Sequence, residues 1–348
     1  MIWADKRDKN NFVTGNDIGL EPLQAIDLSA CSSSLALVNA MKKTSFGGRC
    51  VGEAHDVLCE MFSDKNSFNV LTLSGAMTAA KMGLIITDLI DKGVIHAVVS
   101  TGALITHGLV ENMSLPHFKC SPDQNDSALY QKGCNRIYDT IELEKNLDDI
   151  ERIVAEILDD LPSEETFCSW KLLNYIGNHL QKVKGRGILK SAFEKNIPVY
   201  IPAFTDCELG LDVALQRQKQ AIAGKPQLKF DPFLDLDDFA ERIQKQTTLG
   251  IFTIGGGVPR NWAQQIAPYL ELLNNATGKA KTVKYKYGVR ICPEPAHWGG
   301  LSGCTYSESV SWGKFLSKKE GGKFAEVPAD ATIVLPLLIK SVFEQLNI

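Results

Sequence analysis

Short apolar segments that end in small or polar residues recur along this chain, and helix-like segments separate them. Segment 69–73 reads Asn-Val-Leu-Thr-Leu and is followed by Ser-Gly; a helix is expected over 77–92 and a second strand over 94–100. A strand, a helix and another strand form a crossover unit, whose strands run parallel. Further strands are expected over 198–204, 250–254 and 288–292. This alternation predicts an α/β fold with a doubly wound, mainly parallel sheet.

Other parts of the chain, including both ends, have the apolar spacing of helices. Segments 35–41 and 51–62 are expected to form helices on either side of a loop at 44–48, and no strand is expected before residue 66. Helices are also expected over 143–158, 165–182 and 331–346, the last with Asp330 as its N-cap. We therefore divide the chain into a helical N-terminal extension, 1–65, and a single α/β catalytic domain, 66–348.

Composition limits the class of protein and its partners. The 348 residues carry a formal net charge of −4, so no basic surplus exists to neutralise phosphates and nucleic acid is not an expected partner. The nine cysteines form no CxxC pair, which argues against a zinc site and against a disulfide framework, and no metal is expected. The charged N-terminus and the interrupted apolar stretches predict a soluble cytoplasmic protein with no membrane span.

Four of the predicted strands end in residues suited to ligand binding. Small or polar groups follow them at Ser74-Gly75, Ser100-Thr101, Thr205-Asp206 and Gly255-Gly256-Gly257. Ligands of open parallel sheets bind at the carboxyl ends of strands, and a glycine run before a helix lets the backbone approach a phosphate. The alternative is a tight turn without a ligand, because the glycines do not form a GxGxxG fingerprint.

Lys314 is the candidate nucleophile, with Glu308 six residues and Trp312 two residues before it. A nucleophilic lysine must lose its proton, although its ordinary pKa is about 10.4. Burial beside a large ring disfavours the charged form and lowers that pKa. The alternative is a solvated surface charge.

Several other polar residues each allow two interpretations. Asp206 is either a helix N-cap or a hydrogen-bond partner for a ligand hydroxyl. Glu208 and Asp212 are four residues apart, so they form either a solvated helix face or a pair of ammonium receptors. His107 is either a structural histidine or a site residue, and His297 with Trp298 either caps a pocket or packs.

These segments, in this order, resemble the deoxyhypusine synthase family over roughly residues 15–346. The segment 308–314, Glu-Ser-Val-Ser-Trp-Gly-Lys, is similar to the catalytic lysine segment of that family. Supporting similarities lie at 198–206, 254–258, 132–136, and at 329–331 followed by 334–338.

The resemblance implies an NAD-dependent, redox-neutral transfer. NAD oxidises spermidine, diaminopropane leaves, and the 4-aminobutyl group is held as an imine on Lys314. An acceptor amine then displaces the lysine, and the retained NADH reduces the new imine. The substrate-binding residues it implies are Glu308, Trp312, His107, Asp212 and Asn261. The NAD-binding residues it implies are Ser74, Gly75, Ser100, Thr101, Asp206, Gly255, Gly256, Gly257, Gly299, Asp330 and Ala331. It also implies a homotetramer with active sites at subunit interfaces.

The chain departs from the family pattern around the polyamine. Two aspartates of the family are replaced by Leu211 and Leu301, a histidine by Asn261 and a glutamate by His107. Because the lysine segment is kept, we expect a changed donor or acceptor rather than lost catalysis. The chain is similar to the divergent bacterial branch, and our leading hypothesis is a homospermidine-type product made from spermidine and putrescine. The alternatives are deoxyhypusine synthase itself, with a translation-factor lysine as acceptor, and a non-catalytic NAD-binding regulatory paralogue.

Overall fold

A six-stranded parallel sheet forms the centre of the molecule in a computed structural model that describes residues 7–121, 123–162 and 165–348. Its strands, in spatial order, are β11 (Lys323–Val327), β10 (Tyr287–Ile291), β9 (Thr248–Ile254), β1 (Ser67–Leu73), β2 (Ala97–Ser100) and β7 (Val199–Tyr200). From β1 the chain proceeds outward through β2 to β7, and then returns to build β9, β10 and β11 on the other side. This is the strand order of a doubly wound Rossmann fold, so the predicted fold class is confirmed.

Both faces of the sheet are buried, which explains the continuous apolar runs in its strands. On β1, Leu71 belongs to one hydrophobic cluster and its neighbour Val70 to another. On β9, Phe252 belongs to the same cluster as Leu71, and Ile251 belongs to the same cluster as Val70. Successive side chains of a strand point to opposite faces, so each face carries its own layer of helices.

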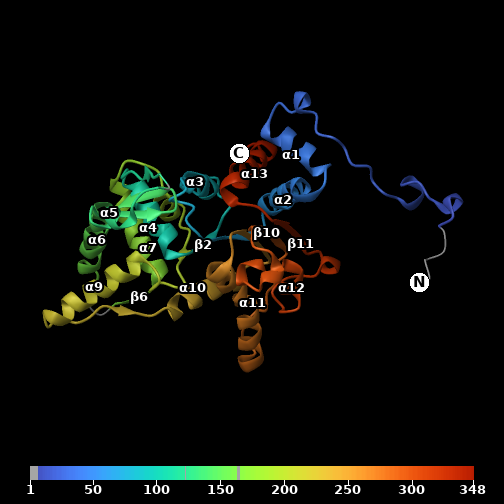
Figure 1. The fold of residues 1–348 in the computed structure, drawn as a ribbon. Coiled ribbons are helices and arrows are strands. Elements are labelled where there is room, and N and C mark those ends of the chain that lie inside the picture. The colour runs from blue at the N-terminus through green and yellow to red at the C-terminus, as the bar shows by residue number, and fades with distance from the viewer. Residues whose placement is uncertain (1–6, 122, 163–164) are drawn as a thin grey trace, which may run out of the picture.

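The helices that cover the sheet come from both ends of the chain and from the crossovers. On one face lie α1 (Ser34–Lys42), α2 (Phe46–Ser63), α3 (Gly83–Asp91) and α13 (Ala331–Leu346); on the other lie α10 (Phe233–Gln244) and α11 (Gly257–Thr277). Figure 1 shows α13 beside α1 and α2, and the Leu35 N–H donates to the Glu344 carboxylate at 2.8 Å. The division at residue 65 stays a prediction.

A second group of helices forms a lobe beyond β2 and β7, on the left in Figure 1. It contains α4 (Gly102–Asn112), α5 (Asp126–Tyr130), α6 (Glu144–Asp159), α7 (Ser169–His179), α8 (Ile188–Glu194) and α9 (Glu208–Ile222). A small antiparallel sheet of β3 (Phe118–Lys119), β5 (Thr140–Leu143) and β4 (Cys134–Ile137) joins them. Two further short strands, β6 (Thr166–Phe167) and β8 (Lys229–Phe230), pair in parallel.

Several boundaries differ from the sequence predictions. The helix predicted over 77–92 begins only at Gly83, because turns occupy the preceding residues and Lys81 has a φ of +63°. The strand predicted over 198–204 is only the two residues of β7, because the chain turns from Pro202 onward. The N-cap of α9 is Cys207 and not Asp206, whereas Asp330 does cap α13 by accepting from the Thr332 N–H at 2.7 Å. Within the described residues, no helix has the length and apolar character needed to span a bilayer.

Candidate active site

Lys314 is placed by a short helix and a glycine turn. The helix α12 (Tyr306–Val310) is capped by the Thr305 side chain, which accepts from the Glu308 N–H at 3.1 Å. After α12 the chain reverses at Gly313, whose φ of +70° suits a residue without a Cβ. The Lys314 N–H then bonds the Ser309 carbonyl at 3.2 Å, and only 8% of the lysine is exposed. Lys314 is therefore buried, unlike a typical surface lysine.

Four predicted site residues share one cavity of about 210 Å³: Asn261, Glu308, Trp312 and Lys314. The Lys314 ammonium donates to the Asn261 Oδ1 at 3.1 Å and lies 5.9 Å from the centre of the Trp312 ring. Trp312 itself is 67% exposed, so it forms an outer wall of the cavity with one side open to solvent. Burial of the amine must therefore come mainly from the other lining residues.

The electrostatics of this cavity favour an uncharged amine. Burial lowers the pKa of Lys314, and the positive charge of Arg260 lowers it further, while Glu308 acts in the opposite direction. Arg260 is itself buried and is held by the carbonyls of Ser302, at 3.4 Å, and Cys304, at 2.6 Å. A fixed cation beside a buried amine prepares that amine for attack on a carbonyl or imine carbon.

Sequence reasoning missed the remaining lining residues: Arg260, Gln264, Gln265, Cys304 and Ser309. Arg260 and Gln264, like Asn261 and Gln265, are four residues apart on α11 and so face the same way. Gln265 could have been predicted from the sequence, because it lies one helical turn after Asn261. Arg260 could have been considered because it directly precedes Asn261.

The predicted NAD-binding residues follow the carboxyl ends of parallel strands, at one edge of the sheet. Ser74 and Gly75 follow β1, Thr101 follows β2, and Gly255 to Gly257 follow β9; we call these residues the strand-end cluster. The chain reverses its direction across the sheet between β1 and β9, the position where ligands of doubly wound folds bind. A hydrogen bond joins the segments that follow these two strands, because the Gly256 N–H donates to the Ser74 Oγ at 2.9 Å.

The strand-end cluster combines closely packed glycines with a free hydroxyl and a helix N-terminus. Gly255 has a φ of +80°, and a Cβ there would lie 2.1 Å from the Ser74 Oγ. A Cβ on Gly256 would lie 2.6 Å from the Ser302 Cα. The Thr101 Oγ1 is buried without a hydrogen-bond partner, and α11 begins directly after Gly256. Packing against Ser74 and Ser302 therefore requires these glycines, and the free hydroxyl and the helix N-terminus are the features that suit a phosphate.

The other predicted NAD-binding residues are spread along the same edge. Ser100 ends β2, and its hydroxyl donates to the Thr101 carbonyl at 3.0 Å. Asp206 follows β7 and Asp330 with Ala331 follows β11, so these residues stand at opposite ends of the sheet edge. Gly299 lies in the exposed loop after β10, with a φ of +76°. Their roles in NAD binding stay predictions.

Helix α11 connects the strand-end cluster to the Lys314 cavity. It begins at Gly257 and carries Arg260 and Asn261 in its first turns. Ser302 adds a second link, because it packs against Gly256 and accepts from Arg260. A ligand at the strand ends and a reacting group at Lys314 would thus be positioned by the same short segment.

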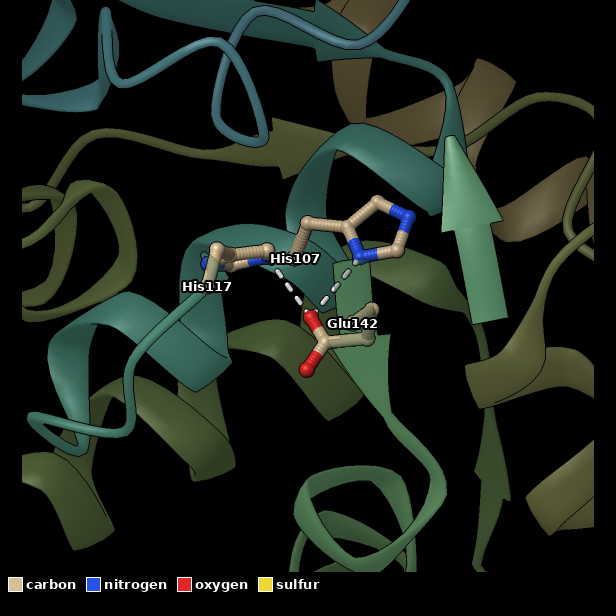
Figure 2. Close-up of side chains that lie close together, drawn as sticks. All are labelled: His107, His117 and Glu142. Atoms are coloured by element: carbon tan, nitrogen blue, oxygen red, sulfur yellow. Dashed lines mark hydrogen bonds and ion pairs between the residues drawn. The ribbon is translucent and has the colours of Figure 1, made fainter. Parts of the chain in front are cut away.

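Two predicted substrate-binding residues lie outside the Lys314 cavity of their own chain. Asp212 is on α9 in the second lobe, where burial, aided by Glu151 and Glu208, raises its pKa to about 7. His107 is on α4, buried against Glu142 and His117 (Figure 2). Burial alone would raise the pKa of Glu142, but hydrogen bonds from its neighbours outweigh it and lower that pKa to about 2.

Comparison with known proteins decides the family. A family profile described as deoxyhypusine synthase matches residues 36–342. A "Probable deoxyhypusine synthase 2" of Methanosarcina acetivorans is 31% identical, over 97% of this chain and 92% of the relative. One of Archaeoglobus fulgidus is 34% identical, over 86% of this chain and 94% of the relative.

The chain belongs to the deoxyhypusine synthase family. Its relatives include a bacterial deoxyhypusine synthase-like protein from Caulobacter vibrioides, 28% identical over 88% of this chain and 82% of that protein. A crystal structure of a candidate deoxyhypusine synthase from Entamoeba histolytica shares the fold, with a TM-score of 0.62 at 15% identity, covering 92% of this chain and 97% of that one. Deoxyhypusine synthases are transferases, so the chain belongs to a class of enzymes whose general reaction is aminobutyl transfer.

Besides His107, two of the departures from the deoxyhypusine synthase pattern can be located. Asn261, which stands where a histidine is expected, is the residue that accepts from Lys314. Leu211, which stands where an aspartate is expected, is 64% exposed on α9. Neither Glu208 nor Asp212 lines the Lys314 cavity, where Glu308 is the carboxylate among the described lining residues.

Proposed function

We propose that this protein is an NAD-dependent aminobutyl transferase of polyamine metabolism. It oxidises spermidine or a related polyamine, releases the remaining amine (1,3-diaminopropane from spermidine), and delivers the 4-aminobutyl group, through an imine on Lys314, to a small amine. The acceptor is putrescine, which makes the product homospermidine. The reaction takes place in the cytoplasm.

The observation that carries this proposal is the state of the Lys314 amine. It is buried, its pKa is lowered, and it faces a cavity that also contains a carboxylate and an aromatic ring. A lowered pKa makes the uncharged amine, which is the nucleophile that imine formation needs, easier to form. Family membership gives the class of reaction in which such an imine carries the transferred group.

Each residue of the Lys314 cavity has a role in this scheme. Asn261 orients the amine through its Oδ1, and Arg260 disfavours reprotonation by its charge. Glu308 binds a terminal ammonium of the polyamine, and the Trp312 face packs against the alkylammonium chain. NAD, when bound by the strand-end cluster, supplies the hydride acceptor and later the hydride donor. Glu308 is the carboxylate among the described lining residues, so the other ammonium groups of the polyamine would be bound by groups outside this cavity.

A homotetramer with active sites between subunits is part of the proposal. Asp212 is an implied substrate-binding residue, yet it lies on α9 in the second lobe and does not line the Lys314 cavity of its own chain. A second copy would have to bring such groups to the polyamine.

Product analysis tests the proposal. The protein would be incubated with NAD, spermidine and putrescine, and the polyamines separated by chromatography and identified by mass spectrometry. Homospermidine that requires NAD and is absent with Lys314→Arg supports the proposal. Labelling of a translation-factor lysine with no polyamine product would favour the protein acceptor, and NAD binding without any transfer would favour a regulatory role.

A further inference from the structure

A buried cluster of two histidines and one carboxylate lies in the second lobe, apart from the Lys314 cavity. His107 is on α4, His117 lies just before β3, and Glu142 is on β5 (Figure 2). Their side chains are 9%, 1% and 0% exposed. Three metal-binding side chains from three separate elements thus meet where solvent is nearly excluded.

The carboxylate of Glu142 is oriented so that one oxygen is left for the histidines. Its Oε1 accepts from the Leu143 N–H at 3.1 Å and from the Asn146 amide at 2.9 Å. Its Oε2 faces the His107 Nδ1 at 3.4 Å and the His117 Nε2 at 2.6 Å. Asn146 also donates to the Pro116 carbonyl at 3.2 Å, next to His117, so one amide supports two members of the cluster. Outer hydrogen bonds of this kind orient the ligands in metal sites.

The three side chains converge on one point. The His117 Nε2 is buried and lies 2.6 Å from the Glu142 Oε2, but no well-directed hydrogen bond joins it to any acceptor. The three potential ligand atoms lie within 4.8 Å of one another. An ion at their centre would bind the His117 Nε2 together with the carboxylate oxygen and the His107 imidazole.

We propose that His107, His117 and Glu142 bind a divalent transition-metal ion, with Zn²⁺ as the fitting occupant. Two imidazoles and one carboxylate are a known ligand set for Zn²⁺, and a water would complete the tetrahedron. The ion would join α4, the segment before β3 and β5, and so fix the small sheet to the helix that follows β2. The sequence-based expectation of no metal came from cysteine spacing, and this ligand set contains no cysteine.

Lys81 opposes metal binding in the observed arrangement. Its ammonium lies 2.8 Å from the His117 Nδ1 and donates to it, which places the ring proton on Nε2. A metal on Nε2 moves that proton to Nδ1, so Lys81 must turn away. Its side chain is 46% exposed and has Glu111 as another partner at 3.7 Å, which allows this movement.

Cobalt titration of the full-length protein tests the site without any activity measurement. After metal removal with a chelator, Co²⁺ is expected to bind with one equivalent per chain and to give visible d–d bands of tetrahedral nitrogen and oxygen ligation. No thiolate-to-cobalt charge-transfer band should appear, which separates this site from the nine free cysteines. Zn²⁺ should displace the Co²⁺ and raise the Tm.

Variants make the result specific. Glu142→Gln and His107→Gln should abolish the bands and the zinc-dependent rise in Tm, while the matched controls Glu144→Gln and His179→Gln should keep both. Asn146→Ala should weaken binding by roughly 10–100-fold, and Lys81→Met should tighten it. If the wild type gives no such bands, or if Glu142→Gln binds Co²⁺ as well as the wild type does, the proposal is wrong.

Discussion

The hydrogen bond between Lys314 and Asn261 allows a direct test of how the cavity controls its amine. The Asn261 Oδ1 accepts from the ammonium at 3.1 Å and so favours the charged form. We predict that Asn261→Leu, which has similar volume and no acceptor, lowers the pKa of Lys314 further. Asn261→Asp places a negative charge at the same position and should raise that pKa.

The size of the change follows from the type of bond. A hydrogen bond to a charged group is worth about 1.5–3 kcal/mol, and one pKa unit corresponds to about 1.4 kcal/mol. Loss of the bond would therefore lower the pKa by about 1–2 units. Because the cavity opens past the exposed Trp312, water can replace part of the bond, so we expect about one unit.

Competitive acetylation read by mass spectrometry gives the pKa of a single lysine. The reactivity of Lys314 toward acetic anhydride would be followed against pH, with an internal amine as reference. The midpoint should move to lower pH in Asn261→Leu and to higher pH in Asn261→Asp. Gln265→Leu is the matched control, because Gln265 lines the same cavity from the same helix without bonding Lys314. An unchanged or raised midpoint in Asn261→Leu would refute the reasoning.

Three further predictions concern stability and cofactor binding. Gly255→Ala should weaken NAD binding in calorimetry and lower the Tm, since its Cβ meets the Ser74 Oγ; adding Ser74→Ala should restore part of both, and no rescue would contradict the clash. Burial raises the pKa of Asp212 to about 7, against about 3.9 in the unfolded chain. The native state therefore binds more protons than the unfolded state, and the free energy of unfolding falls as the pH rises from 4 to 7. Asp212→Asn should remove this pH dependence and raise the free energy of unfolding by about 1–2 kcal/mol at pH 8 in urea titrations, after allowance for partial exposure. An unchanged pH dependence in this variant would contradict the prediction. Asp330→Ala removes the cap of α13 and should lower the free energy of unfolding by about 1 kcal/mol in the same assay. An unchanged free energy would show that this cap does not stabilise α13.

The central sheet was predictable because burial on both faces gives its strands continuous apolar runs. The strand β11 was missed because Lys323 and Glu326 interrupt its apolar residues at the edge of the sheet. The strands of the small sheet are only two to four residues long, so they carry too little pattern to stand out. Local composition thus predicts buried, central strands better than short or edge strands.

The site was predictable only as far as its chemistry is local in sequence. Glu308, Trp312 and Lys314 lie within seven residues, and they share one cavity. The partner of the amine, Asn261, is 53 residues away in sequence, and its contact depends on how α11 packs beside α12. His107 follows β2 as expected, but the orientation of α4 turns it toward Glu142 rather than toward the Lys314 cavity. Sequence spacing does not specify such an orientation.

The central claim is that Lys314 carries the transferred group, and covalent trapping tests it most directly. The protein would be treated with labelled spermidine, NAD and borohydride, and the labelled peptide mapped by mass spectrometry. We predict a reduced aminobutyl adduct on Lys314 that is lost in Lys314→Arg and kept in Lys318→Arg. An adduct on a different lysine, or equal labelling of Lys314→Arg, would contradict the account.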